Sequence, residues 1–188
     1  MTPLPMERSG ARYGGGMCVV AAPAVAGRLV GTPTVSASTI TIRIGEWTVS
    51  GVYLPPMMPI TAFQDRLQEV ADSDVVLGDL NVRLPSMPMG KVASKDQERA
   101  QAVVDWMQRA ALAHLQPSAG KGPWASARYE TGLTVDHSFV RARWAERATL
   151  YLPRNDGLDL ETDYVYIICV EVGDRARRRT TTLDLLRY

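Results

Sequence analysis

The chain has 188 residues, of which 46% are hydrophobic and 22% charged, and its formal net charge at pH 7 is +1. These values are typical of one globular domain that can bury a core, and they exclude a strong overall basic field that would attract nucleic acid. No apolar run is long enough to span a membrane. The two cysteines, Cys18 and Cys169, lie within apolar runs. We therefore expect buried free thiols, with a disulfide as the alternative. Free thiols fit a reducing intracellular compartment, a condition that the nucleus, the cytoplasm and some organelles all meet.

The first half of the chain predicts strands and one helix. Residues 1–13 lack periodicity and are expected to be irregular. Residues 39–44 alternate polar and apolar side chains, and a Gly45-Glu46 turn leads into residues 47–53, which predicts a hairpin. The predicted elements of this half are strands at residues 17–22, 39–44, 47–53 and 75–77, and a helix at residues 62–71 that Thr61 caps.

The second half contains the clearest helical pattern. Hydrophobic residues recur at helical spacing over residues 97–115, Ser94 or Asp96 can cap the first turn, and Pro117 stops the helix. Strands that alternate with helices predict an α/β domain with a mixed sheet over residues 14–172. The remaining predicted elements are strands at residues 133–140 and 164–172, and a basic tail at residues 173–188.

A candidate site follows the predicted buried strand at residues 75–77. This strand runs into Gly78-Asp79-Leu80-Asn81. Side chains two positions apart on an extended chain point the same way, so Asp79 and Asn81 present a carboxylate beside a carboxamide. This pair suits a polarised water molecule or a phosphate, and strand ends commonly carry the sites of α/β proteins. Turns often contain Gly, Asp or Asn, so the rest of the chain decides the meaning of this motif.

The order of several motifs along the chain is more specific than any one of them. In chain order they are Gly15-Gly16 before an apolar strand, Val52-Tyr53-Leu54-Pro55-Pro56, Gly78-Asp79-Leu80-Asn81, Val135-Asp136-His137-Ser138-Phe139-Val140 and Thr162-Asp163-Tyr164. This series resembles the endonuclease/exonuclease/phosphatase superfamily, and within it the apurinic-type endonuclease domain of LINE-like (non-LTR) retrotransposons. The resemblance covers residues 14 to about 172. It implies a four-layer α/β sandwich, in which two mixed sheets pack face to face between outer helices.

The resemblance also implies metal-assisted hydrolysis of phosphodiesters or phosphomonoesters. In that chemistry a divalent cation, usually Mg²⁺, neutralises charge on the phosphate while a water molecule attacks in line. Asp79 would activate or orient the water, and Asn81 would hold the water or a phosphate oxygen. Asp136 would orient a catalytic imidazole, and Asp163 would lie near the metal. The residue types suit these roles, because Mg²⁺ prefers oxygen ligands and a base needs an ionisable group.

Two departures from the family pattern predict a weakened site. The family's last motif ends in a histidine that contacts the scissile phosphate, and Tyr164 stands at that position here. The family also has, upstream of the Gly-Gly strand, a strand with Asn and a strand that ends in a metal-binding Glu. Here only residues 1–13 precede that strand, and Glu7 is the one carboxylate among them. Glu7 could therefore be a metal ligand together with Asp163, or it could be a solvated terminal charge. We therefore expect a sandwich that lacks its N-terminal strands, with a partner protein, a second copy or the C-terminal tail covering the open edge.

Several further residues could contact a substrate or a partner. Trp124 could stack on a base or pack within its loop. Arg141 and Arg143 could follow a phosphate backbone or belong to a solvated face. The basic run at residues 175–179 could bind RNA or an acidic protein surface, or be a disordered tail.

Neither histidine is expected to act directly in the site. His137 follows Asp136 on a strand, so its side chain points to the opposite face, where we expect it to pack or to form hydrogen bonds. His114 lies near the end of the long predicted helix, where we expect it to interact with the helix dipole.

These observations favour a catalytically impaired, endonuclease-like module derived from a retroelement-type endonuclease. It would serve as a structural or binding subunit of a larger protein or nucleoprotein assembly, with no membrane partner. The alternative is an active Mg²⁺-dependent nuclease or phosphatase that uses the four carried-over residues. A third interpretation is one half of a split enzyme that another chain completes. Mg²⁺ is the expected cofactor of the active forms, and a purely structural role needs none.

Overall fold

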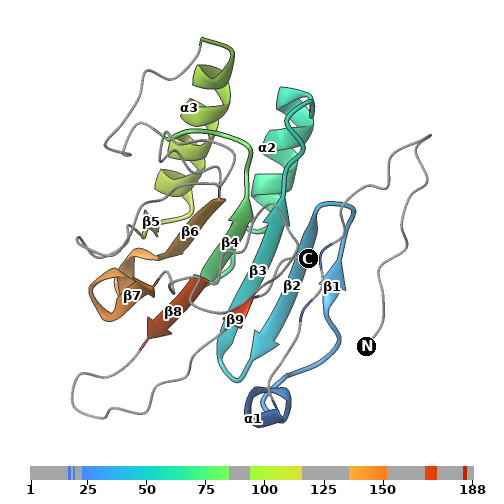
Figure 1. Ribbon diagram of the computed structural model, residues 1–188, viewed down its shortest axis with the longest axis vertical. Coiled ribbons are helices and arrows are strands. Elements are labelled where there is room, and N and C mark those ends of the chain that lie inside the picture. The colour runs from blue at the N-terminus through green and yellow to red at the C-terminus, as the bar shows by residue number, and fades with distance from the viewer. Residues whose placement is uncertain are drawn as a thin grey trace, which may run out of the picture.

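A six-stranded mixed sheet forms the centre of the molecule, with strand order β1-β2-β3-β4-β6-β5 (Figure 1). The computed structural model describes residues 17, 19, 23–84, 94–115, 136–151, 168–172 and 184–185. Strands β3 and β4 pair in parallel, and the other neighbouring pairs are antiparallel. The strands are β1 (Thr34–Val35), β2 (Thr39–Ile44), β3 (Trp47–Tyr53), β4 (Val75–Asp79), β5 (Leu112–His114) and β6 (Asp136–Arg141).

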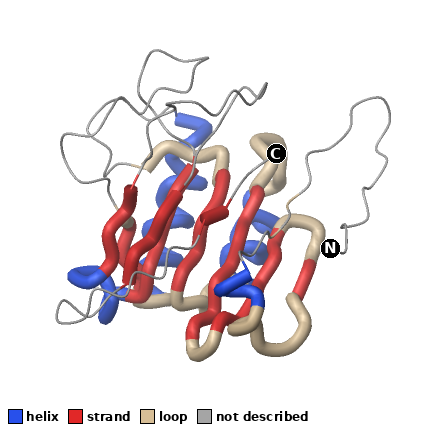
Figure 2. Tube along the Cα trace, turned by 60° about the horizontal axis from the view of Figure 1, so that its bottom comes forward, coloured by secondary structure: helices blue, strands red, loops and turns tan. Residues whose placement is uncertain are grey.

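Two helices, α2 (Ile60–Glu69) and α3 (Ser94–Arg109), cover one face of this sheet (Figure 2). Their buried side chains pack against every second side chain of the strands, such as Val76 and Phe139, which point to this face. Trp106 of α3 meets Phe139 edge to face, with ring centroids 5.3 Å apart. A short helix, α1 (Pro23–Ala26), precedes β1. No helix among the described residues is long and apolar enough to cross a membrane.

The opposite face of the central sheet carries a second apolar cluster, which includes Val49, Leu77 and Val140. A 3₁₀ helix, η1 (Ala142–Arg147), packs on this cluster through Trp144, whose ring centroid lies 4.8 Å from that of Trp47. A three-stranded antiparallel sheet follows, in the order β7-β8-β9, and Ala148 at its start also packs on the cluster. Its strands are β7 (Ala148–Tyr151), β8 (Ile168–Val172) and β9 (Asp184–Leu185).

The described residues thus form a helical layer, a large mixed sheet and a smaller second sheet, which confirms the predicted α/β class. Strand β9 belongs to the segment predicted as a basic tail. It pairs with β8, with Cys169 opposite Asp184. This part of the tail therefore covers one edge of the smaller sheet, whereas the basic run at residues 175–179 lies outside the described residues.

The predicted hairpin is confirmed with the bounds of β2 and β3. Helix α2 begins at Ile60 after Pro59, without a side-chain cap, so the prediction that Thr61 caps it was wrong. Strand β4 continues through Asp79, two residues beyond the predicted end. The predicted strand at residues 17–22 lies mostly outside the described residues.

The long second helix is shorter than its hydrophobic pattern predicts. Helix α3 ends at Arg109, and Ala111 has a positive φ of 49°, which turns the chain. Leu112 then starts β5, which pairs with β6. Leu112 and Leu115 continue the helical spacing, but pairing with a distant strand determines their structure. His114 consequently lies in a strand, so its predicted interaction with a helix terminus was wrong.

Candidate functional site

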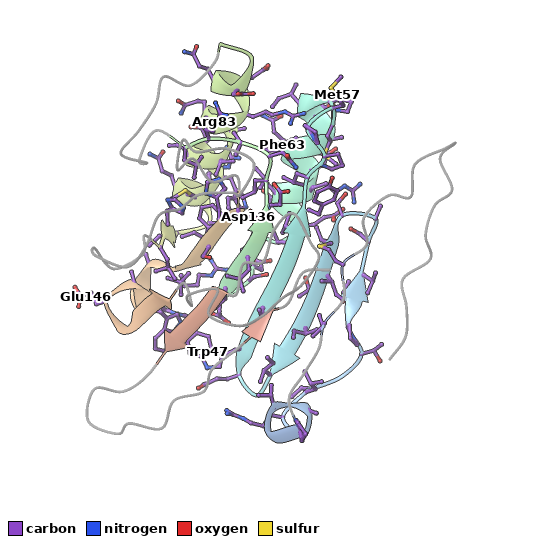
Figure 3. The ribbon with its side chains drawn as sticks, viewed as in Figure 1. Trp47, Met57, Phe63, Arg83, Asp136 and Glu146 are labelled. Atoms are coloured by element: carbon purple, nitrogen blue, oxygen red, sulfur yellow. The ribbon has the colours of Figure 1, made fainter. Side chains whose placement is uncertain are left out.

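Two carboxylates lie directly opposite each other at one end of the central sheet. The antiparallel register of β4 and β6 pairs Asp79 with Asp136, and Figure 3 shows Asp136 at the start of β6. Asp79 lies two positions after Leu77, and Asp136 lies four positions before Val140. Residues an even number of positions apart in a strand share a face, so both carboxylates point toward the face that carries the second sheet. Residues opposite one another in such a pair have Cβ atoms about 5 Å apart. Asp79 is 8% exposed, and Asp136 is more accessible.

The prediction that the chain stays extended from Asp79 to Asn81 was wrong, because β4 ends at Asp79 and Asn81 closes this end of the sheet through a tight turn. Its backbone has a positive φ of 48°, and its N–H donates to Oδ1 of Asp79 at 2.8 Å. Its side-chain Nδ2 donates to the carbonyl of Leu54 at 2.9 Å, and the Leu54 N–H donates to the Asp79 carbonyl. Because Nδ2 is engaged, the carboxamide oxygen of Asn81 is the group that can bind a cation or accept a hydrogen bond from water.

Tyr53 is a member of this strand end to which the sequence assigned no role. The parallel register of β3 and β4 pairs Tyr53 with Asp79. Tyr53 lies four positions after Val49 in β3, so the two side chains share a face. Val49 belongs to the apolar cluster on the carboxylate face, and the phenol therefore lies on that face as well. A tyrosine that ends the strand before the Asp79 strand was a usable signal, because neighbouring parallel strands end at the same edge.

His137 lies on the helical face, as predicted, and is buried and hydrogen-bonded. Its Nε2 is 2.8 Å from the Val82 carbonyl oxygen, and its Nδ1 is 3.2 Å from Nε2 of His114. Burial lowers the pKa of His137 to about 3 and that of His114 to about 4. Both imidazoles are therefore neutral at pH 7.

Arg141 ends β6, about 16 Å of extended chain from Asp136, and Arg143 follows it in η1. Arg141 donates to the Ala110 carbonyl and lies 3.8 Å from Asp72. Arg143 pairs with Asp74 at 3.0 Å, and its guanidinium lies over the Trp144 ring. In the structure these cations contact acidic residues at the end of the sheet opposite the Asp79–Asp136 pair.

The residues at this strand end suit a hard divalent cation in their chemistry. Asp79, Asp136 and Asn81 offer carboxylate and amide oxygens, which Mg²⁺ prefers. Within the described parts of the chain, no group of three histidine, cysteine or acidic side chains gathers as a metal site. The predicted residues Asp163, Tyr164, Glu7 and Trp124 lie outside the described residues.

Comparison with known proteins gives matches among solved structures only, since neither family models nor curated proteins match the chain. The endonuclease domain of TRAS1, a telomere-specific non-LTR retrotransposon, superimposes with a TM-score of 0.51 at 16% identity, covering 79% of this chain. This chain spans 64% of that domain. The 3′-5′ exonuclease NExo from Neisseria meningitidis has a TM-score of 0.47 at 18% identity, with 68% of this chain and 62% of that one covered. The first of these similarities shows that the chain shares the fold of that endonuclease domain, as the motif order predicted.

Proposed function

We propose that this chain is an endonuclease-like module that binds nucleic-acid phosphodiesters with a divalent cation and hydrolyses them poorly. It would serve as a binding subunit of a larger nucleoprotein assembly. The observation that carries the proposal is the register pair of Asp79 and Asp136 beside the fixed carboxamide of Asn81. Three oxygen-bearing side chains at one strand end form a surface that suits a cation with a phosphate.

Electrostatics supports cation binding at this position. Like charges directly opposite one another on neighbouring strands repel, and Asp79 is largely removed from water. A bound divalent cation would offset this repulsion and attract an anionic phosphate. The cation would supply charge neutralisation for the phosphate. Asp79 and Asp136 would hold it, and Asn81 would orient a water molecule or a phosphate oxygen.

Low turnover follows from Tyr164. A phenol has a reference pKa of about 10 and carries no positive charge, so it cannot stabilise the developing charge as an imidazolium does. Loss of one electrostatic stabiliser of this kind commonly lowers rates by about 10²- to 10³-fold. The retained Asp79, Asn81 and Asp136 favour the alternative of an active Mg²⁺-dependent nuclease, either alone or completed by a second chain.

The test combines binding and cleavage. Purified protein is incubated with Mg²⁺ or Mn²⁺ and labelled single-stranded, duplex or abasic DNA, and both anisotropy and nicking are followed. We expect cation-dependent binding that weakens about tenfold in Asp79→Ala, because a direct cation ligand is lost. We also expect little nicking by the wild type and a gain in Tyr164→His.

A matched control is Asp72→Ala, which removes the same charge from an exposed position at the other end of the sheet. It should leave binding unchanged. If wild-type protein nicks DNA as fast as Tyr164→His, and Asp79→Ala abolishes this nicking, the alternative is correct. If cation-dependent binding survives both Asp79→Ala and Asp136→Ala, the site is elsewhere and the proposal is wrong.

A further inference from the structure

We propose that His137 is a positioning residue that holds the Asp79–Asn81 turn in place through the carbonyl group of Val82. The proposal deepens the proposed function, on which it rests for the role of the turn in binding. His137 follows Asp136 in β6, so these two neighbours point to opposite faces of the sheet. Strand β6 therefore contributes to the site twice, with a carboxylate on one face and an imidazole that holds the turn from the other.

The turn needs such a restraint because the regular strand pairing ends at Asp79. The last register pair of β4 and β6 is Asp79 with Asp136, and Asn81 then adopts a positive φ. On the β3 side, the Asn81 side chain donates to Leu54. On the β6 side, His137 contacts the carbonyl of Val82, the residue after Asn81. The two contacts hold the turn between its neighbouring strands.

The partners of His137 determine which of its ring nitrogens carries the proton. The Val82 carbonyl can only accept, so Nε2 of His137 carries the hydrogen and donates. An imidazole that carries its single hydrogen on Nε2 has an acceptor at Nδ1, so Nε2 of His114, 3.2 Å away, donates to it. Hydrogen bonds therefore run in one direction, from His114 through His137 to the turn. Phe139 lies beside both rings, with centroids 5.1 Å from His114 and 5.9 Å from His137, and restricts their movement.

If His137 only filled space in the core, replacing it with a ring of similar size would leave the turn unchanged. Val82 and His137 are each 1% exposed, so the carbonyl cannot turn to water when its donor is removed. His137→Phe keeps a ring of similar size and removes the donor. His137→Gln keeps an N–H that can reach Val82. His114→Phe is the matched control, because it removes a ring from the same pair and leaves the donor to Val82 unchanged.

The experiment measures amide hydrogen exchange at Asn81, whose N–H donates to Asp79, together with Mn²⁺-dependent binding of a short labelled single-stranded DNA. We expect His137→Phe to speed exchange at Asn81 about tenfold relative to the core amide of Phe139, and to weaken DNA binding by a similar factor. His137→Gln should restore most of both properties, and His114→Phe should change them little. Exchange at Asn81 that follows Phe139 in every variant would overturn the proposal.

If His137→Phe fails to fold, a measurement on the wild-type protein alone tests whether His137 donates to Val82. Side-chain ¹⁵N shifts should show His137 protonated at Nε2 and unprotonated at Nδ1, and the opposite tautomer would overturn the proposal. If wild-type protein binds no DNA with Mn²⁺, the proposed function fails. The tautomer and the exchange at Asn81 would still decide whether His137 holds the turn.

Discussion

Replacing Gly78 with alanine is expected to destabilise the domain by on the order of 4 kcal/mol, enough to unfold a marginally stable protein. A Cβ atom at this position would lie 1.9 Å from the carbonyl oxygen of Val52 and within 3 Å of its backbone nitrogen and carbonyl carbon. The obstacle is the backbone of β3, so no side-chain rotation can relieve it. Gly78 also has a φ of 152°, a conformation that residues with a Cβ rarely adopt. Urea denaturation followed by circular dichroism measures the loss.

Gly27→Ala provides a control for this prediction. Nothing lies within 4 Å of a Cβ at Gly27, and its φ lies outside the positive region. The free energy of unfolding of this variant should lie within about 0.5 kcal/mol of the wild-type value. Equal stabilities of the Gly78 and Gly27 variants would mean that β3 and β4 do not approach as closely as the structure shows. The glycine of the Gly78-Asp79-Leu80-Asn81 motif thus serves strand packing, whereas its two polar residues belong to the proposed site.

Local pattern was sufficient to predict the hairpin and the strand that leads to Asp79, although not where that strand ends. It was also sufficient to place Asp136 in a strand and to turn His137 away from it, because alternation is a local property. The order of motifs supplied the fold. What the sequence could not provide is the pairing of Asp79 with Asp136, which lie 57 positions apart in the chain. That neighbourhood depends on the antiparallel register of β4 and β6, which only the folded sheet defines.

Long-range pairing also explains why His114 lies in a strand and why Arg141 and Arg143 lie far from Asp136. Leu112 and His114 continue a helical spacing, but β6 offers them backbone partners, and Ala111 turns the chain to reach those partners. Arg141 and Arg143 lie close to Asp136 in sequence and invited a role in substrate binding. The extended strand β6 instead places them at the opposite end of the sheet, where they contact Asp72 and Asp74. Their assignment to a substrate stays a prediction without support from this geometry.

Acid is expected to destabilise the domain through the buried histidine pair. His114 and His137 have folded-state pKa values of about 4 and about 3, because burial disfavours their charged forms, against about 6.5 in an unfolded chain. Between these values the unfolded state binds more protons, so the free energy of unfolding falls as the pH is lowered from about 6.5. The stabilisation is complete above about pH 6.5 and is lost progressively toward pH 3. From pH 7 to pH 5 the pair should contribute a loss of about 3 kcal/mol, allowing for the partial exposure of His114.

Urea denaturation at several pH values between 7 and 5 tests this prediction in a range where few carboxylates titrate. The double variant His114→Phe, His137→Gln cannot take up these protons, so its free energy of unfolding should change much less over the same interval. Equal pH dependence in the two proteins would show that other groups cause the acid sensitivity. Because His137 also contacts the turn that carries Asn81, protonation should loosen that turn before the whole domain unfolds. Faster exchange of the Asn81 amide than of the Phe139 amide as the pH falls, after correction for the intrinsic rates, would reveal this order of events.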